Sequence, residues 1–330
     1  IVASIAQVPV KSVTKSETDR LRQLETALQA RIFGQDEAVA AVSGAIKRNR
    51  AGFGNERKPV ASFLFVGPTG VGKTELCNQL ADILGIPMIR FDMSEYQEKH
   101  TVSRLVGSPP GYVGYDEGGL LTDAVRRQPH AVLLLDEIEK AHADIYNILL
   151  QILDYATLTD NMGRKADFRN VVIIMTSNAG ARDLGKRLIG FVDNRQNSVT
   201  VTNALEKIFS PEFRNRLDRI VTFKRLGDRE IRMIVSKEIE QFRQQLTRRR
   251  VDLTVSEEAI AWFAREGFSD EFGARNIARL VQEKLKDFLV DEILFGRLMQ
   301  GGKALVSSTG DDISVQIESS TGIKDQAVSR

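Results

Sequence analysis

Residues 63–74 read FLFVGPTGVGKT, a stretch that joins a short apolar run to a glycine-rich loop. The run 63–66 predicts a buried strand, and residues 67–74 fit the phosphate-binding pattern G-x-x-x-x-G-K-[ST]. Glycines let backbone N–H groups turn inward around a phosphate chain, while Lys73 places a charge at the β- and γ-phosphates and Thr74 can bind Mg²⁺. The predicted nucleotide contacts of this loop are Gly67, Pro68, Thr69, Gly70, Val71, Gly72, Lys73 and Thr74.

A predicted helix follows the loop and ends at Gly85. Leu76, Leu80 and Leu84 recur at every fourth residue, so one apolar stripe can lie on a sheet while the helix N-terminus faces an anion. A chance glycine-rich turn is the alternative. We favour the nucleotide loop, because strand, loop and helix occur in the order that phosphate binding requires.

The segment AVLLLDEIEK, residues 131–140, predicts a second buried strand that ends in two carboxylates. At the carboxyl edge of a parallel sheet, Asp136 is expected to hold Mg²⁺ through water and Glu137 to polarise the attacking water as a base. Acidic residues that close a strand are often only solvated turn residues. The phosphate loop upstream makes hydrolysis the better interpretation.

Composition limits the class of protein. A chain of 330 residues with 42% hydrophobic content is expected to form two domains. Its net charge of +2, from 46 basic and 44 acidic residues, gives no bulk attraction to nucleic acid or to membranes. The single cysteine, Cys77, suits a reducing compartment, and no apolar run or signal peptide predicts membrane insertion, so we expect a cytoplasmic protein. Because the chain starts at Ile1 and not at methionine, we expect a segment of a longer polypeptide.

Residues 1–226 predict a linker followed by a nucleotide-binding domain. Residues 1–17 are polar and lack a period, which is typical of a linker, and the large domain is expected over residues 18–226. Ile32 and Phe33 are candidates for the pocket of the adenine ring, although the sequence alone slightly favours ordinary core positions for them. The polar stretch 157–170, TLTDNMGRKADFRN, is expected to be a loop.

Two loops and one strand end are further candidate sites. Glycines on both sides of Tyr112 and Val113, in residues 107–119, predict a bulky side chain on a flexible hinge that contacts something that moves, rather than a plug on its own loop. Asn178 closes the predicted strand 171–178, where it can orient a water near a γ-phosphate or simply end the strand. Residues 189–191, IGF, form an apolar tip in a polar loop, which is expected to dock on its own domain or on a partner.

The pattern changes at residue 228, where a second domain is expected to begin. A helix from 228 has the apolar positions Ile231, Val235, Ile239, Phe242 and Leu246. We expect a strand at 251–255, a capped helix from 256, a long helix over 274–295, and strands near 304–306 and 313–317. The small domain is therefore expected over 227–318, with a disordered tail at 319–330.

In one order the chain contains GPTGVGKT, LLLDEIEK, TSNAG, PEFRNRLD and FGARN, and it thereby resembles the AAA+ ATPases of the Clp unfoldase group. The wording of the motifs is most similar to second ATPase modules of the ClpA type. The resemblance implies the P-loop α/β fold of this family: a five-stranded parallel sheet flanked by helices, with a smaller, mainly helical C-terminal domain that has a short sheet. It also implies a homo-hexamer that unfolds and translocates unfolded or tagged proteins with ATP and Mg²⁺ and feeds them to the ClpP peptidase.

The same resemblance implies roles for individual residues. Arg216 matches the finger that reaches the γ-phosphate of a neighbouring subunit, and Arg275 matches the second sensor of the small domain. Gly111, Tyr112, Val113 and Gly114 match the pore loop that grips substrate. Ile189, Gly190 and Phe191 match the loop that docks on the peptidase, although ClpA more usually has leucine where Phe191 stands. Adaptors are expected to act through an N-terminal domain outside this chain.

Three alternatives remain. A disaggregase of the ClpB kind is the same engine without a peptidase, and the 189–191 tip is the feature that argues against it. A nucleic-acid clamp or helicase loader is disfavoured by the near-neutral charge and by an aromatic pore loop. A scaffold that binds nucleotide without hydrolysis is disfavoured by Glu137 and Arg216.

Overall fold

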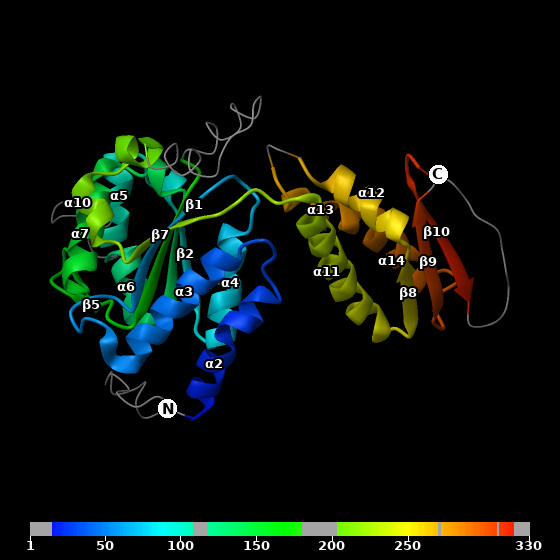
Figure 1. The fold of residues 1–330 in the computed structure, drawn as a ribbon, viewed down its shortest axis with the longest axis horizontal. Coiled ribbons are helices and arrows are strands. Elements are labelled where there is room, and N and C mark those ends of the chain that lie inside the picture. Colours follow the sequence, from blue (N-terminus) through cyan, green and yellow to red (C-terminus); the bar gives the residue numbers. More distant parts are fainter. Residues whose placement is uncertain (1–14, 108–117, 180–202, 270–271, 309, 320–330) are drawn as a thin grey trace. The chain divides into compact units, whose positions relative to one another are not determined.

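The computed structural model describes residues 15–107, 118–179, 203–269, 272–308 and 310–319. The chain divides into a large unit, residues 1–68 and 72–224, and a small unit, residues 69–71 and 225–330. Figure 1 shows the chain as a ribbon coloured from blue at the N-terminus to red at the C-terminus. Within the described residues, none of the helices combines the length and the apolar character needed to cross a bilayer.

The large unit is built on one sheet whose strands all run parallel, in the order β2-β3-β6-β1-β7. The strands are β1 (Ala61–Val66), β2 (Met88–Asp92), β3 (Ala131–Asp136), β6 (Val171–Ser177) and β7 (Arg219–Thr222). Every residue of β1, β3 and β6 is buried, as expected for strands covered on both faces. The predicted five-stranded parallel sheet is thus confirmed.

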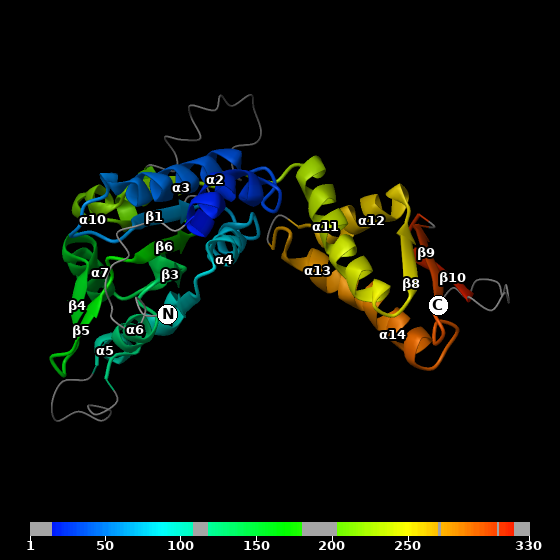
Figure 2. The same ribbon diagram turned by 90° about the horizontal axis from the view of Figure 1, so that it is seen from below.

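Helices cover both faces of this sheet (Figures 1 and 2). The helices of the large unit are α2 (Lys15–Gln29), α3 (Asp36–Arg48), α4 (Lys73–Leu84), α5 (Lys99–Val106), α6 (Leu120–Arg127), α7 (Ala143–Tyr155) and α10 (Pro211–Arg216). Short 3₁₀ or π turns lie at Asn49–Phe53, Met93–Tyr96 and Ile138–Lys140. Helix α2 packs on α3 and α4, and α4 packs on β3 and β6.

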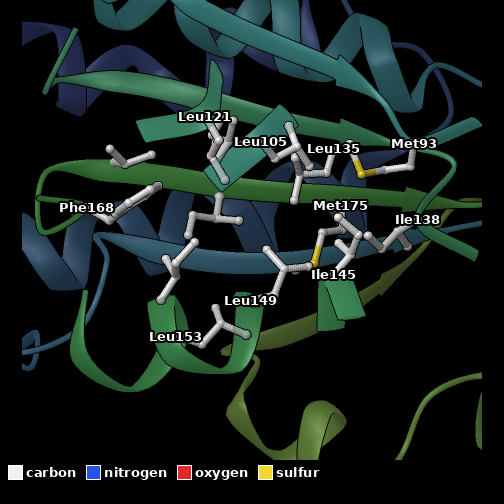
Figure 3. Packing of buried hydrophobic residues seen from close by; sticks show 14 of the residues in the cluster. Met93, Leu105, Leu121, Leu135, Ile138, Ile145, Leu149, Leu153, Phe168 and Met175 are labelled. Carbon is white, nitrogen blue, oxygen red and sulfur yellow. The ribbon is translucent and has the colours of Figure 1, made fainter. Parts of the chain in front are cut away.

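Alternate residues of each strand serve different cores, because successive side chains point to opposite faces. Leu133, Leu135 and Met175 join side chains of α5, α6 and α7 in one buried cluster, which Figure 3 shows from close by. The intervening residues of β3 and β6, such as Leu134 and Ile174, are equally buried but lie outside that cluster. The sheet is therefore fixed from both sides, and its polar groups are found at the strand ends.

The stretch 157–170 was predicted to be a loop, and this prediction is wrong. Strands β4 (Thr157–Thr159) and β5 (Lys165–Asp167) pair in antiparallel register as a short hairpin. The turn between them places Gly163 at φ 78°, a left-handed conformation that glycine adopts without strain. Leu158 and Ala166 are buried on the inner face of the hairpin. Because each strand contains only one buried apolar residue, the sequence of this stretch looked polar throughout.

The small unit packs helices on a separate sheet of order β10-β9-β8. Its elements are α11 (Asp228–Thr247), β8 (Val251–Val255), α12 (Glu257–Gly267), α13 (Arg275–Val281), α14 (Asp287–Leu294), β9 (Gly302–Ser308) and β10 (Ile313–Ser319). The five apolar positions predicted on the first helix are all buried. Ser256 caps α12 by accepting a hydrogen bond from the Ala259 N–H at 3.2 Å.

The predicted long helix 274–295 contains a π turn, Gln282–Lys286, between α13 and α14. Gln282 and Asp287, at the two ends of this turn, both keep right-handed helical dihedral angles, so the helix continues through it. Leu285 is completely buried within the turn. Ile277, Val281, Leu285 and Leu289 are all buried, so the helix keeps one apolar side against the core on both sides of the π turn.

Candidate active site

The loop after β1 has a backbone that needs glycine at two positions. A Cβ on Gly67 would lie 2.6 Å from the carbonyl oxygen of Phe223, so no larger residue fits beside β7. Gly72 is the N-cap residue before α4 and has φ 103°, in the left-handed region, with open space around it. The loop thus follows a path that leads from the end of a buried strand to the N-terminus of a helix, the arrangement that favours anions.

Lys73, the first residue of α4, is buried, and its ammonium group returns to the loop. Its Nζ donates to the carbonyl oxygens of Gly67 at 2.6 Å and Pro68 at 2.7 Å, and to Oδ1 of Asn178 at 2.7 Å. All three of these oxygens belong to neutral groups. A phosphate oxygen would form a stronger hydrogen bond with this ammonium group than any of the three neutral acceptors does, because hydrogen bonds between charged partners are the stronger ones.

Asn178 connects the loop to the carboxylates at the end of β3. Its Nδ2 donates to Oε1 of Glu137 at 3.4 Å, and its backbone N–H donates to Oε1 of Glu139 at 2.9 Å. The carboxyl ends of β1, β3 and β6 are neighbours in the sheet, so the three predicted residues Lys73, Glu137 and Asn178 meet at one edge. This cluster is defined by Lys73, Asp136, Glu137 and Asn178 and is called the edge cluster below.

Asp136 is buried and holds two partners that the sequence did not reveal. Arg90 on β2 forms an ion pair with its Oδ2 at 2.7 Å, and the hydroxyl of Thr176 on β6 donates to its Oδ1. Both partners come from the strands on either side of β3. Their only sequence signal is the register of parallel strands, which cannot be known before the sheet order is known.

Glu137 has left-handed dihedral angles, φ 56° and ψ 50°, which are uncommon for a residue other than glycine. Its Oε2 lies 2.5 Å from Nζ of Lys140. The hydrogen bond to Glu137, reinforced by nearby carboxylates, raises the pKa of Lys140, so the ammonium stays charged beside the predicted base. The predicted base thus stands between an amide donor, Asn178, and a cation.

The cysteine behind the loop is not available for chemistry. Cys77 lies on α4, fully buried, and its Sγ donates to the Lys73 carbonyl oxygen at 3.3 Å. Burial, together with the charge of Asp136, raises the pKa of the thiol far above its ordinary value. The thiol is a packing group.

The two residues predicted to hold adenine have different surroundings. Ile32 is buried and Phe33 is half-buried. Gln35, which sequence reasoning did not single out, is buried and makes a two-point contact with the backbone of Lys224, accepting from its N–H at 3.0 Å and donating to its carbonyl oxygen at 2.9 Å. This contact fixes the segment that follows α2 against the end of the large unit, and the adenine role of Ile32 and Phe33 stays a prediction.

The two predicted arginines lie on different units, Arg216 on α10 of the large unit and Arg275 on α13 of the small unit. Arg216 ends α10, and its Nε lies 2.9 Å from Oδ1 of Asp154 on α7, without the alignment of a hydrogen bond. Oε1 of Glu212, on the same helix as Arg216, lies 3.9 Å from the Nη2 atom of Arg216. Arg275 is exposed at the start of α13 in the small unit. The roles of Arg216 as the finger and of Arg275 as the second sensor stay predictions.

The predicted pore loop 111–114 and docking tip 189–191 lie outside the described residues. The described residues on both sides of the first loop are joined by the β4–β5 hairpin. Asn161 Nδ2 donates to the carbonyl oxygen of Gly107, while Arg164 forms ion pairs with Asp123 on α6 at 3.3 Å and with Asp160 at 2.7 Å. The hairpin turn, a feature that the sequence did not predict, therefore ties down the segments before and after the loop.

Comparison with known proteins identifies the family. A family model described as an AAA domain (Cdc48 subfamily) matches residues 58–220, and one described as the C-terminal, D2-small domain of ClpB protein matches residues 226–306. A relative from Chlorobaculum tepidum, named probable chaperone protein ClpB 1, is 45% identical over 99% of this chain and 74% of its own length. The chain belongs to the Clp family of AAA+ ATPases. As a member of that family it is an ATPase module with a nucleotide-binding domain.

Other Clp relatives have names from different branches of the family. The "ClpA homolog protein" of Fuscovulum blasticum is 51% identical over 96% of this chain and 40% of its own length. The "ATP-dependent Clp protease ATP-binding subunit ClpC" of Staphylococcus saprophyticus is 43% identical over 100% of this chain and 42% of its own length. This chain spans about two fifths of the length of most of these Clp relatives.

Proposed function

We propose that this chain binds ATP with Mg²⁺ and hydrolyses it, and that the full-length protein is a cytoplasmic homo-hexamer that unfolds and translocates proteins into a ClpP-type peptidase. The observation that carries the proposal is the edge cluster. There, a P-loop lysine, a strand-end carboxylate and a strand-end amide are joined by hydrogen bonds across three neighbouring strands. Family membership and the wording of the motifs support the same activity.

The residues of the edge cluster fit a nucleotide with its metal. Gly67 lets the loop pass directly beside Phe223, whose carbonyl oxygen would lie 2.6 Å from a Cβ there, and α4 presents its N-terminal amides at the end of the loop. Thr74 and Asp136 offer the hard oxygen ligands that Mg²⁺ prefers, and we assign the metal to them. The bound metal would neutralise charge on the phosphates. Glu137 would accept the proton of the attacking water while Asn178 orients that water and Lys73 binds the phosphates.

The step from hydrolysis to unfolding follows from the stability of substrates. Folded domains are stable by only about 5–15 kcal/mol, so repeated pulls on a gripped terminus can trap them unfolded. We propose that Tyr112 and Val113, between Gly111 and Gly114, supply that grip, since friction on a backbone needs no particular substrate sequence. Substrates are then unfolded or tagged proteins, delivered directly or by an adaptor.

A disaggregase is the second candidate. It is favoured by the small-domain family model, which takes its description from ClpB, and by relatives at 45–48% identity that are named ClpB. We prefer coupling to a peptidase because of Ile189, Gly190 and Phe191, whose apolar character suits docking on a partner. Family membership itself favours a protein substrate over a nucleic acid.

The test uses the full-length protein with ATP and a fluorescent protein that has a degradation tag. We expect loss of fluorescence in the presence of a ClpP-type peptidase and fragments on a gel. Tyr112→Ala is expected to keep ATP hydrolysis and to lose unfolding, while Tyr112→Phe keeps both because it retains the ring. If Tyr112→Ala still unfolds the substrate, the pore assignment is wrong. If the full-length protein instead reactivates an aggregated substrate enzyme, and no peptidase ring degrades that substrate, the disaggregase is favoured.

A further inference from the structure

Thr176 contacts two residues of the edge cluster and opens the TSNAG motif, in which only Asn178 was predicted as a site residue. It is the sixth residue of β6 and only 1% exposed. Its hydroxyl donates to Oδ1 of Asp136 and accepts from the backbone N–H of Glu137 at 3.0 Å. One side chain therefore contacts both consecutive residues at the end of β3.

The direction of these two bonds is fixed by the chemistry of the partners. An ionised carboxylate only accepts and a backbone N–H only donates, so the single hydroxyl proton must point to Asp136. Both bonds are buried, where leaving a polar group unpaired is unfavourable. A valine of the same shape would remove both bonds at once, and a serine would keep them.

The bond to the Glu137 N–H acts at a strained position. Left-handed dihedral angles disfavour residues other than glycine, and they persist only where the surroundings fix them. This backbone turn directs the Glu137 carboxylate toward Asn178 and Lys140, which lie 3.4 Å and 2.5 Å from its two oxygens. The orientation of the predicted base thus depends on the backbone that Thr176 holds.

The opposite side of Asp136 is held as well. Arg90 forms an ion pair with Oδ2 of Asp136 at 2.7 Å, but the Arg90 side chain is 49% exposed and is therefore also in contact with solvent. Thr176 is the buried and uncharged member of the pair of partners. The position of Asp136 Oδ1 therefore depends on a side chain that is itself buried in the sheet.

We infer that Thr176 is a positioning residue for ATP hydrolysis, whose hydroxyl holds the metal carboxylate Asp136 and the base Glu137 in mutual register. The inference rests on the proposed function, because it takes the assigned roles of those two carboxylates as given. Partners that orient metal ligands typically change affinity or activity about 10–100-fold when they are removed.

The experiment measures kcat and KM for ATP with the full-length protein and its Thr176→Val, Thr176→Ser and Glu137→Gln variants. We expect Thr176→Val to lower kcat about 10–100-fold while KM changes less than about threefold, and Thr176→Ser to restore most of kcat. A second readout is binding of a fluorescent ADP at increasing Mg²⁺ concentrations, in which Thr176→Val is expected to require several-fold more Mg²⁺. Thr122→Val is the matched control, because Thr122 is equally buried but its hydroxyl donates to Gly119 at 2.9 Å, away from the edge cluster.

The outcomes separate the two proposals. Full turnover in Thr176→Val, equal losses in Thr176→Ser and Thr176→Val, or an equal loss in Thr122→Val would each overturn the positioning role. Full turnover in Glu137→Gln would instead overturn the proposed base and, with it, the proposed function. Thermal melting shows whether each variant is folded, and if Thr176→Val melts below the assay temperature, Thr176→Ala is expected to show the same loss of kcat and the same Mg²⁺ requirement.

Discussion

The sheets of the two units differ in what lies at their strand ends. In the five-stranded sheet of the large unit all strands run parallel, so the carboxyl ends of β1, β3 and β6 gather at one edge, where buried polar groups form hydrogen bonds with one another. In the small unit β8 and β9 are parallel while β10 is antiparallel, so its strand ends do not collect in this way. The described ion pair beside this sheet, Lys284 with Asp312, lies at the surface. The parallel topology of the large unit therefore gathers the edge cluster at one place, and the sheet of the small unit has no equivalent convergence of its strand ends.

Among the variants that test this comparison between the two units, Arg216→Ala in the large unit is expected to have the largest effect, a loss of ATP turnover. An arginine finger contributes on the order of 10³–10⁵ in rate, so turnover should fall by about that factor while nucleotide binding and melting temperature change little. Steady-state hydrolysis and binding of a fluorescent ADP measure the two quantities. Arg214→Ala, on the same helix, is the control and should keep turnover; wild-type turnover in Arg216→Ala would remove the assignment.

A change of the opposite kind is expected from Phe263→Ala in the small unit. Phe263 is fully buried and meets Trp262 edge to face at a centroid distance of 5.3 Å, so its truncation should lower the free energy of unfolding by about 3–5 kcal/mol. Denaturant unfolding followed by the fluorescence of Trp262 measures this loss. Phe295→Ala is the matched control, since that ring is 79% exposed and its loss should change stability by less than about 0.5 kcal/mol. Equal effects of the two variants would contradict the packing described for this unit.

The smallest effect is expected at the surface of the small unit. The hydrogen bond from Lys284 lowers the pKa of Asp312 below its ordinary value of 3.8. A lowered pKa in the folded state means that the pair stabilises the fold above the ordinary carboxyl pKa and loses this effect as the pH falls through the folded-state pKa. Because the pair is exposed, Asp312→Asn should cost only about 0.2–1 kcal/mol at pH 7 and less than that at pH 2. Unfolding curves at both pH values, with Asp311→Asn as control, test this; a larger loss at the lower pH would have the wrong sign.

The sequence predicted those elements whose characteristic residues follow one another directly in the chain. The strand, loop and helix around Lys73 follow one another directly in the sequence, and the apolar run before Asp136 is continuous, so both were predicted. The β4–β5 hairpin was missed because each strand has only three residues. The five-stranded sheet itself came from the family resemblance, which the comparisons confirm.

The partners of the site residues could not be predicted in the same way. Thr176 and Arg90 lie 40 and 46 residues from Asp136, and they meet it only because β2, β3 and β6 are neighbours in register. Lys140 is close in sequence to Glu137, but their contact depends on the left-handed turn at Glu137, which no residue type announces. The roles of the site residues themselves stay predictions.

The measurement that tests the account most directly compares ATP binding and ATP hydrolysis in the full-length protein and its Glu137→Gln variant. General base catalysis contributes about 10²–10⁴-fold, so we predict that Glu137→Gln binds ATP with nearly unchanged affinity and hydrolyses it slower by about that factor. Hydrolysis at the wild-type rate by a Glu137→Gln protein that still binds ATP would contradict the central claim that the strand ends of the large unit form a hydrolytic site.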